Sequence, residues 1–179
     1  KTSDHKLIAS GLSSVYVWNN FPSNEQSKPD VTLSPSYYQN GDGVDVVVIE
    51  KYIYVNNYNG NNILVYDEKN LSASSSPIFA VSVADYTHNS LDSIGYIQNP
   101  VMVTNGTKLL VSSDFDRKFY VFNTLPQASG VFSDQIISTA RFNLSPWDIA
   151  LYNNTFVAVG KTQICIWNDV DKISNLPTS

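Results

Sequence analysis

Residues that commonly carry enzyme chemistry are scarce in this sequence. It contains two histidines, His5 and His88, and a single cysteine, Cys165. Catalytic zinc commonly takes three protein ligands, and two histidines so far apart in the sequence do not predict such a site. Cys165 lies within an apolar run, where a free cysteine usually packs as a small hydrophobic side chain. We therefore predict no catalytic residue in this chain.

Two carboxylates, Asp45 and Asp148, hold more promising positions. Each stands near the start of an apolar run, 44–49 for Asp45 and 147–151 for Asp148. If these runs are the innermost strands around a central channel, both carboxylates face that channel, and we name them as candidate binding residues. Met102 takes the comparable place in a third run, so the ring of acids is incomplete.

Calcium is the metal for which the sequence offers ligands. Carboxylate and carbonyl oxygens are the ligands that Ca²⁺ prefers, and they occur at short spacing in segment 40–45, Asn-Gly-Asp-Gly-Val-Asp. The segment departs from a complete EF-hand loop, because Lys51 stands where a bidentate Glu is required. A polar turn before a strand has the same composition. We therefore expect no cofactor, with Ca²⁺ as the alternative.

The sequence also contains Asn-x-Ser/Thr motifs, which can accept an N-linked glycan. The four motifs fall in or beside segments that we predict to be turns, and they begin at Asn70, Asn105, Asn143 and Asn153. Asn105 and Asn153 occupy the same turn of successive repeats. Glycosylation at these positions is a hypothesis that depends on an extracellular location.

The elements that must position these residues come from an internal repeat. Four segments share three apolar residues or Tyr, then an aromatic residue, then Asn or Asp, at 15–19, 63–67, 119–123 and 164–168. Their aromatic residues are spaced by 48, 56 and 45 positions. Periods of this size are typical of repeated four-stranded blades.

Further β-rich runs surround each repeated segment. Gly, Asn, Ser and Asp separate the runs, and such junctions, Asn105-Gly106 among them, are typical of hairpin turns. The runs predict fourteen strands and no helix, at 7–9, 15–18, 30–33, 44–49, 52–55, 63–66, 78–83, 101–103, 109–111, 119–122, 135–139, 147–151, 156–159 and 164–167.

Many of these predicted strands are apolar at consecutive positions, which indicates sheets that are covered on both faces. Stacked blades provide such cover. We therefore predict an all-β fold, a β-propeller segment of about 3.5 four-stranded antiparallel blades. The single domain would span 1–179, with blade units at 1–35, 43–84, 100–142 and 146–179. A β-sandwich is the competing fold, but it does not explain the repeat.

The second and third units resemble NHL-type propeller repeats. The third unit shows the Pro, the Gly/Asn turn, the Asp and the Arg of that pattern at Pro100, Asn105-Gly106, Asp114 and Arg117, before an apolar strand at 119–122. The resemblance implies a six-bladed type of propeller. Lactonase-type members of that class bind a divalent metal at the channel through acidic and amide side chains, which is the origin of our metal alternative.

Composition narrows the choice of partners. The net charge is −5 and no cluster of Lys and Arg is present to neutralise phosphates, so we expect no nucleic-acid partner. No apolar run approaches the roughly 18–20 residues of a membrane helix, so we expect no transmembrane segment. The low charged fraction of 15%, together with 11 Tyr, favours an extracellular or cell-surface location.

The leading functional hypothesis is a non-enzymatic extracellular or cell-surface β-propeller module that acts as a binding or structural platform. Its expected partners are the remaining blades of the propeller, in the same or another chain, because an open segment exposes two apolar blade faces. A protein or carbohydrate ligand would bind to that platform. The alternative is a channel-mouth hydrolase of the lactonase or esterase kind, with a divalent metal at Asp45 and Asp148.

Overall fold

The computed structural model describes residues 6–11, 14–34, 45–56, 62–82, 101–114, 117–174 and 177. These residues form fourteen strands in four antiparallel sheets, which we name blades 1 to 4 in chain order. Blade 1 contains β1 (Leu7–Ser10), β2 (Val15–Trp18) and β3 (Val31–Leu33); blade 2 contains β4 (Val46–Ile49), β5 (Tyr52–Asn56), β6 (Asn62–Asp67) and β7 (Phe79–Ser82); blade 3 contains β8 (Val101–Thr104), β9 (Leu109–Ser113), β10 (Lys118–Phe122) and β11 (Gln135–Ser138); blade 4 contains β12 (Pro146–Tyr152), β13 (Thr155–Gly160) and β14 (Ile164–Trp167).

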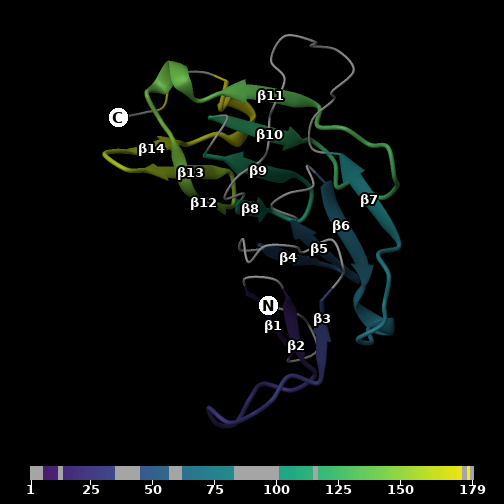
Figure 1. Ribbon diagram of the computed structural model, residues 1–179. Coiled ribbons are helices and arrows are strands. Elements are labelled where there is room, and N and C mark those ends of the chain that lie inside the picture. The colour runs from purple at the N-terminus through teal and green to yellow at the C-terminus, as the bar shows by residue number, and fades with distance from the viewer. Residues whose placement is uncertain are drawn as a thin grey trace.

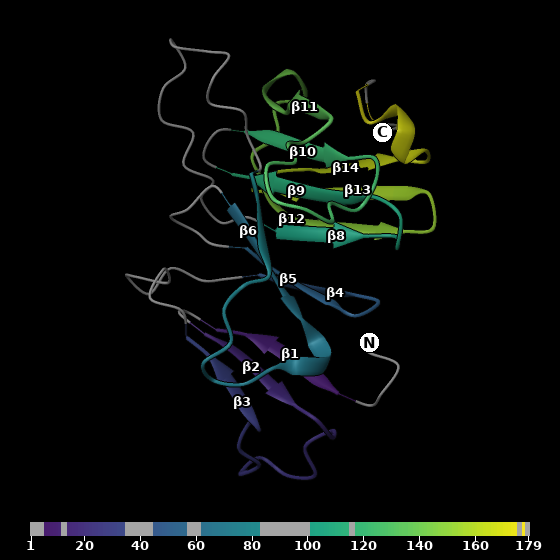
Figure 2. The ribbon, with the colours of Figure 1, turned by 90° about the vertical axis from the view of Figure 1, so that its right-hand side faces the viewer.

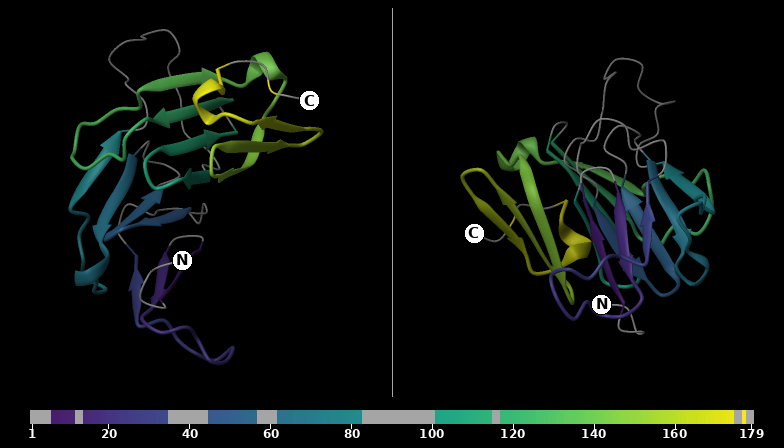
Figure 3. Two further views of the ribbon diagram at one scale, coloured as in Figure 1. Left: turned by 180° about the vertical axis from the view of Figure 1, so that it is seen from behind. Right: turned by 60° about the horizontal axis from the view of Figure 1, so that its bottom comes forward.

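The four blades stand one after another along an open arc, with blade 1 at one end and blade 4 at the other (Figures 1 and 2). The strands β1, β4, β8 and β12 lie along the concave side, and successive members of this set contact one another. The same arc is visible from behind (Figure 3, left). The predicted fold, an all-β partial propeller, is therefore confirmed.

Three hydrophobic clusters hold the arc together, one between each pair of neighbouring blades. Val17 of blade 1 packs with Ile53 of blade 2 in the first cluster, and Ile63 of blade 2 packs with Val111 of blade 3 in the second. The third joins blades 3 and 4 and contains Phe119, which contacts the aromatic rings of both Phe156 and Trp167 edge-to-face. Successive strand residues point to opposite faces, so a blade between two neighbours buries both faces.

The aromatic residue and the Asn or Asp that mark each repeat lie at the end of the third strand position of a blade. In two blades the backbone N–H of that Asn donates to an aspartate that begins the outer strand, from Asn19 to Asp30 Oδ2 at 2.7 Å and from Asn123 to Asp134 Oδ2 at 2.6 Å. These contacts pin the connection to the outer strand. In blades 1 and 3, the Asn of the repeated pattern thus makes the same hydrogen bond.

The junction at Asn105-Gly106 is longer than a two-residue turn. Asn105-Gly106 lies in a four-residue loop, because Thr104 pairs with Leu109. Asn105 Oδ1 accepts from the N–H groups of Thr107 and Lys108, at 3.1 and 2.9 Å, and Gly106 has a φ of +91°. The asparagine side chain therefore organises the loop that glycine permits.

The expectation of no helix requires a small correction. Three short 3₁₀ turns occur in the part of the chain that the structure describes, at η1 (Glu68–Asn70), η2 (Ala140–Phe142) and η3 (Val170–Lys172). Asp67 and Asp169 cap η1 and η3 by accepting a backbone N–H from Lys69 and Asp171. Within the described ranges, no helix has the length and apolar character needed to cross a bilayer.

Candidate functional site

Asp45 immediately precedes β4 and is held by two backbone N–H groups. Its Oδ1 accepts from the N–H of Val46 at 2.8 Å, and its Oδ2 accepts from the N–H of Met102 at 2.5 Å. Met102 belongs to β8, the innermost strand of the next blade. The carboxylate therefore joins blade 2 to blade 3 at the concave side of the arc.

Burial changes the acidity of this carboxyl group. Loss of solvent raises the pKa of Asp45 above its ordinary value, and this effect exceeds the opposing effect of the hydrogen bonds from Met102 and Val46. The negative charge of Asp148 adds to the rise in the Asp45 pKa. The charge of Asp148, in blade 4, thus acts through space on Asp45, in blade 2.

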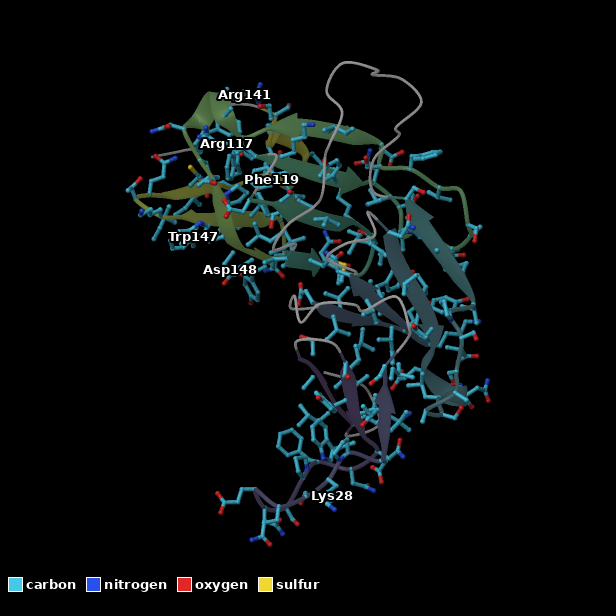
Figure 4. All side chains as sticks on the ribbon, in the orientation of Figure 1. Lys28, Arg117, Phe119, Arg141, Trp147 and Asp148 are labelled. Carbon is cyan, nitrogen blue, oxygen red and sulfur yellow. The ribbon has the colours of Figure 1, made fainter. Side chains whose placement is uncertain are left out.

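Asp148 follows a β-bulge between Pro146 and Asp148 in β12, at the open end of the arc (Figure 4). Its side chain is exposed. Its Oδ1 accepts from the N–H of Ile149 at 2.8 Å, and among the described residues no hydrogen bond to its Oδ2 is found. This carboxylate therefore has one oxygen held by its own strand and one without a hydrogen bond in the described part of the chain.

The concave side also contains a cavity of about 340 Å³. Eight residues from the innermost described strands of the four blades line it, and only Thr104 has a polar side chain: Ile8, Val46, Val47, Val48, Met102, Val103, Thr104 and Leu151. Neither Asp45 nor Asp148 is one of these lining residues.

The most prominent surface feature is the outer face of blade 4. In the pairing of β12 with β13, Asp148 lies opposite Val159 and Ala150 lies opposite Val157. In the pairing of β13 with β14, Ile164 lies opposite Val159 and Ile166 lies opposite Val157. The aliphatic side chains on this face are Ala150, Val157, Val159, Ile164 and Ile166, which we call the blade 4 end face. Ile164 is 64% exposed and Ile166 is 39% exposed.

A matched position in blade 2 shows what normally covers such residues. Ile53 and Phe156 are each the second residue after a two-residue hairpin loop, so they hold equivalent positions in blades 2 and 4. Ile53 pairs with Tyr66, and Phe156 pairs with Trp167. Ile63 and Val65 therefore correspond to Ile164 and Ile166. The side chains of Ile63 and Val65 are fully buried against blade 3. The blade 4 end face thus has the composition of an inter-blade surface but no blade over it in the described structure.

The opposite end of the arc has an outer face as well. Leu7 pairs with Trp18 and Ala9 pairs with Tyr16, on the side of blade 1 that faces away from blade 2. These four side chains are half-buried. The indole of Trp18 donates to the backbone carbonyl of Ser27 at 3.1 Å, which holds its ring against the loop before β3.

All four glycosylation candidates occupy exposed positions in turns or loops. Asn70 ends η1, Asn105 follows β8, Asn143 follows η2 and Asn153 lies in the β12–β13 hairpin. Asn143 and Asn153 have positive φ angles of 55° and 52°, which asparagine adopts more readily than most residues. These placements leave room for a glycan at each position.

The remaining sequence candidates give little for chemistry. His5, His88 and residues 40–44 of the oxygen-rich segment lie outside the described residues. Cys165 is buried in the cluster between blades 3 and 4, and this burial raises the pKa of its thiol. Within the described ranges, no three His, Cys, Asp or Glu side chains form a group that could hold a metal ion.

Sequence reasoning predicted exposed blade faces but not the residues of the blade 4 end face. The run Ile164-Cys165-Ile166-Trp167 has the same apolar character as Ile63-Leu64-Val65-Tyr66, so no local signal separates the exposed strand from the buried one. The strand register supplies this information, because it shows that Asp148 and Asp45 hold equivalent positions relative to the hairpins that follow them.

No protein-family model and no curated protein matches this sequence. Among solved structures, the chain is similar to a Bacteroides uniformis protein assigned as a 6-phosphogluconolactonase, with a TM-score of 0.60 and 15% identity over 93% of this chain and 51% of that chain. It is also similar to a chain in a humanized mutant of the Chaetomium thermophilum polycomb repressive complex 2, with a TM-score of 0.57 and 15% identity over 92% of this chain and 35% of that chain.

A chain in an active polycomb repressive complex 2 in the basal state gives a TM-score of 0.58 and 14% identity over 92% of this chain and 34% of that chain. This chain therefore spans between about a third and about a half of the length of these three structures. At such low identity, the similarity concerns the fold alone.

Proposed function

We propose that this chain is a non-enzymatic β-propeller module that binds protein through the blade 4 end face. The observation that carries the proposal is the contrast between Ile164 and Ile166, which are 64% and 39% exposed, and the matched Ile63 and Val65, which are fully buried. Burying an aliphatic side chain of this size contributes about 1.5–3 kcal/mol. A contiguous apolar sheet face is therefore a strong candidate for association.

The occupant that fits this face best is a further antiparallel blade. Each of the three inter-blade clusters in the chain pairs one apolar sheet face with another, and the blade 4 end face repeats that composition. The similar chains from polycomb repressive complex 2 belong to a multi-protein complex, which agrees with a protein partner. We propose that a second copy of this chain supplies that blade, because its blade 1 has an apolar outer face.

The test uses a second copy of the chain as the probe, because its blade 1 offers an apolar outer face. Sedimentation velocity over a concentration series should show reversible association of the wild-type chain. Ile166→Lys should weaken that association at least about tenfold, equivalent to about 1.4 kcal/mol. Ile136→Lys is the matched control, since Ile136 is 50% exposed on β11, away from the end face.

Two results would overturn the proposal. One is a wild-type chain that remains monomeric throughout the concentration series. The other is an Ile136→Lys variant that weakens association as much as Ile166→Lys does, because this would indicate a general effect of added charge.

We further propose an extracellular or cell-surface location and an NHL-type repeat. The exposed turn positions of Asn70, Asn105, Asn143 and Asn153 support glycosylation, and glycosylation requires the secretory route. Intact-mass measurement of the protein from its native source should give a mass above that of the bare polypeptide. A mass equal to the bare polypeptide would remove the glycosylation proposal.

A channel-mouth hydrolase is the second candidate. It is favoured by the fold similarity to the protein assigned as a lactonase and by the electrostatic influence of Asp148 on Asp45. Both oxygens of Asp45 already accept backbone N–H groups, which makes this carboxylate a poor metal ligand. Calorimetric titration with Ca²⁺ separates the two: saturable binding that Asp45→Ala and Asp148→Ala abolish would favour the hydrolase.

A further inference from the structure

The contact between Asp45 and Met102 shows how one blade fixes the position of the next. Asp45, Val47 and Ile49 share one face of β4, and Val47 and Ile49 belong to the cluster between blades 2 and 3. From this face, Asp45 Oδ2 reaches the N–H of Met102 in β8. An edge-strand N–H that no sheet neighbour can take is thereby satisfied.

Blade 4 has the same hairpin and the same carboxylate position as blade 2, but no described blade packs against the blade 4 end face. The hairpins Ile49–Tyr52 and Tyr152–Thr155 each enclose two residues, with φ values of 55° at Glu50 and 52° at Asn153. Counted back from these hairpins, Tyr152 corresponds to Ile49, Ala150 to Val47 and Asp148 to Asp45.

The local geometry of the two carboxylates is the same. Oδ1 accepts the N–H of the following residue at 2.8 Å in both, from Val46 to Asp45 and from Ile149 to Asp148. The difference lies at Oδ2, which in Asp45 accepts from Met102 and in Asp148 has no hydrogen bond among the described residues. Asp148 also lies on the same face as the apolar residues of the blade 4 end face.

We infer that Asp148 is a positioning residue of the blade 4 end face, whose Oδ2 accepts a backbone N–H from the innermost strand of the blade that docks there. The inference rests on the proposed function and adds the chemistry of the partner. The apolar side chains supply most of the contact area, and the carboxylate fixes the position of the docked strand along β12 and its orientation. The side of a helix would not offer a donor to this oxygen, because its interior N–H groups are already bonded within the helix.

The innermost strand of blade 1 meets the same requirement when a second copy is the probe. β1 is an edge strand of its sheet and contacts β4 along the concave side. A second copy would therefore present the free edge of β1 to Asp148, and by register β1 holds the second strand position of its blade, as β9 does in blade 3.

The test compares Asp148→Asn and Asp148→Ala with Ile166→Lys in the same sedimentation series. A hydrogen bond to a charged acceptor corresponds to a change of about ten- to hundredfold in the dissociation constant, and we expect both Asp148 variants to weaken association by that factor. Both variants remove one negative charge from a chain of net charge −5, which by general repulsion alone would strengthen self-association. Glu50→Gln is the matched charge control, since Glu50 is exposed in the β4–β5 hairpin.

Two further measurements keep a structural effect apart from a docking effect. The thermal midpoint of the Asp148 variants should equal that of the wild type, because the described chain gives this side chain only the local bond from Ile149. Hydrogen exchange in the peptide that covers β1 should slow on association of the wild type and slow less for Asp148→Ala.

The outcomes distinguish the inference from the function on which it rests. If Ile166→Lys abolishes association and the Asp148 variants associate like wild type, the end face binds protein but the inference about Asp148 is wrong. If Ile166→Lys also leaves association unchanged, the proposed function itself is wrong.

Discussion

At the scale of single residues, Asp45 and Asp148 show that one local geometry can serve two situations. Each carboxylate caps the N–H that follows it, at 2.8 Å. Asp45 is then enclosed by the next blade and takes the N–H of Met102, whereas Asp148 is exposed. The cost of losing each side chain should therefore differ.

Replacing Asp45 with alanine should lower the free energy of unfolding at neutral pH by about 1–3 kcal/mol, because the N–H of Met102 then lacks its acceptor. Urea denaturation followed by circular dichroism measures this change. Asp148→Ala is the matched control and should change the stability of the monomer by less than about 0.5 kcal/mol. Equal losses for the two variants would contradict the assignment of Asp45 as an inter-blade contact.

The raised pKa of Asp45 predicts the sign of one pH effect. Its carboxyl binds a proton more tightly in the folded than in the unfolded chain, since burial is the main cause of the shift. The associated stability is fully present below the ordinary carboxyl pKa and is lost as the pH rises through the folded-state pKa. Wild-type stability relative to Asp45→Asn should thus fall with rising pH in urea titrations, and a constant difference would argue against the shift.

At the scale of elements, neighbouring blades are joined by side chains as well as by apolar clusters. Tyr54 of β5 is buried, and its hydroxyl donates to the carbonyl of Pro126 at 2.9 Å, in the connection between β10 and β11. Burial raises the pKa of Tyr54 to about 12. A second contact joins Ser145, before β12, to the side chain and the backbone carbonyl of Asp114 after β9.

Tyr54→Phe should remove the bond to Pro126 and lower the free energy of unfolding by about 0.5–1.5 kcal/mol. Tyr52→Phe is a suitable control, because it removes a hydroxyl from the preceding hairpin position of the same strand. Chemical denaturation of both variants measures the effect. A loss from Tyr52→Phe as large as that from Tyr54→Phe would mean that the hydrogen bond is not the cause.

At the scale of the whole molecule, the position of a blade in the arc decides the role of its apolar residues. Blades 2 and 3 have neighbours on both sides, so β6 and β9 are buried along most of their length. β14 alternates between exposed and buried residues, because only one side of blade 4 is covered. Equivalent isoleucines should therefore carry different costs when they are truncated.

Ile63→Ala should lower the free energy of unfolding by about 2–5 kcal/mol, since it opens a cavity between blades 2 and 3. Ile164→Ala, at the matched position of blade 4, should lower it by less than about 0.5 kcal/mol in the monomer. Thermal or urea denaturation at a concentration below the onset of association measures both. A large loss for Ile164→Ala would show that another part of the chain covers the blade 4 end face.

The sequence by itself determined the repeating strands and the propeller class. Local β-propensity, turn residues and the recurrence of an aromatic residue followed by Asn or Asp depend only on near neighbours in the chain, so these features could be read directly. It also selected Asp45 and Asp148 as a related pair, because both precede apolar runs of the same kind.

Only the tertiary structure decided which apolar strands are covered and what the carboxylates contact. Ile164 and Ile63 have similar local sequences, and the exposure of each depends on whether a neighbouring blade packs against it. Likewise, the bond from Met102 to Asp45 joins residues that are 57 positions apart. Packing between sheets is a long-range property, and the order of residues within one strand does not contain it.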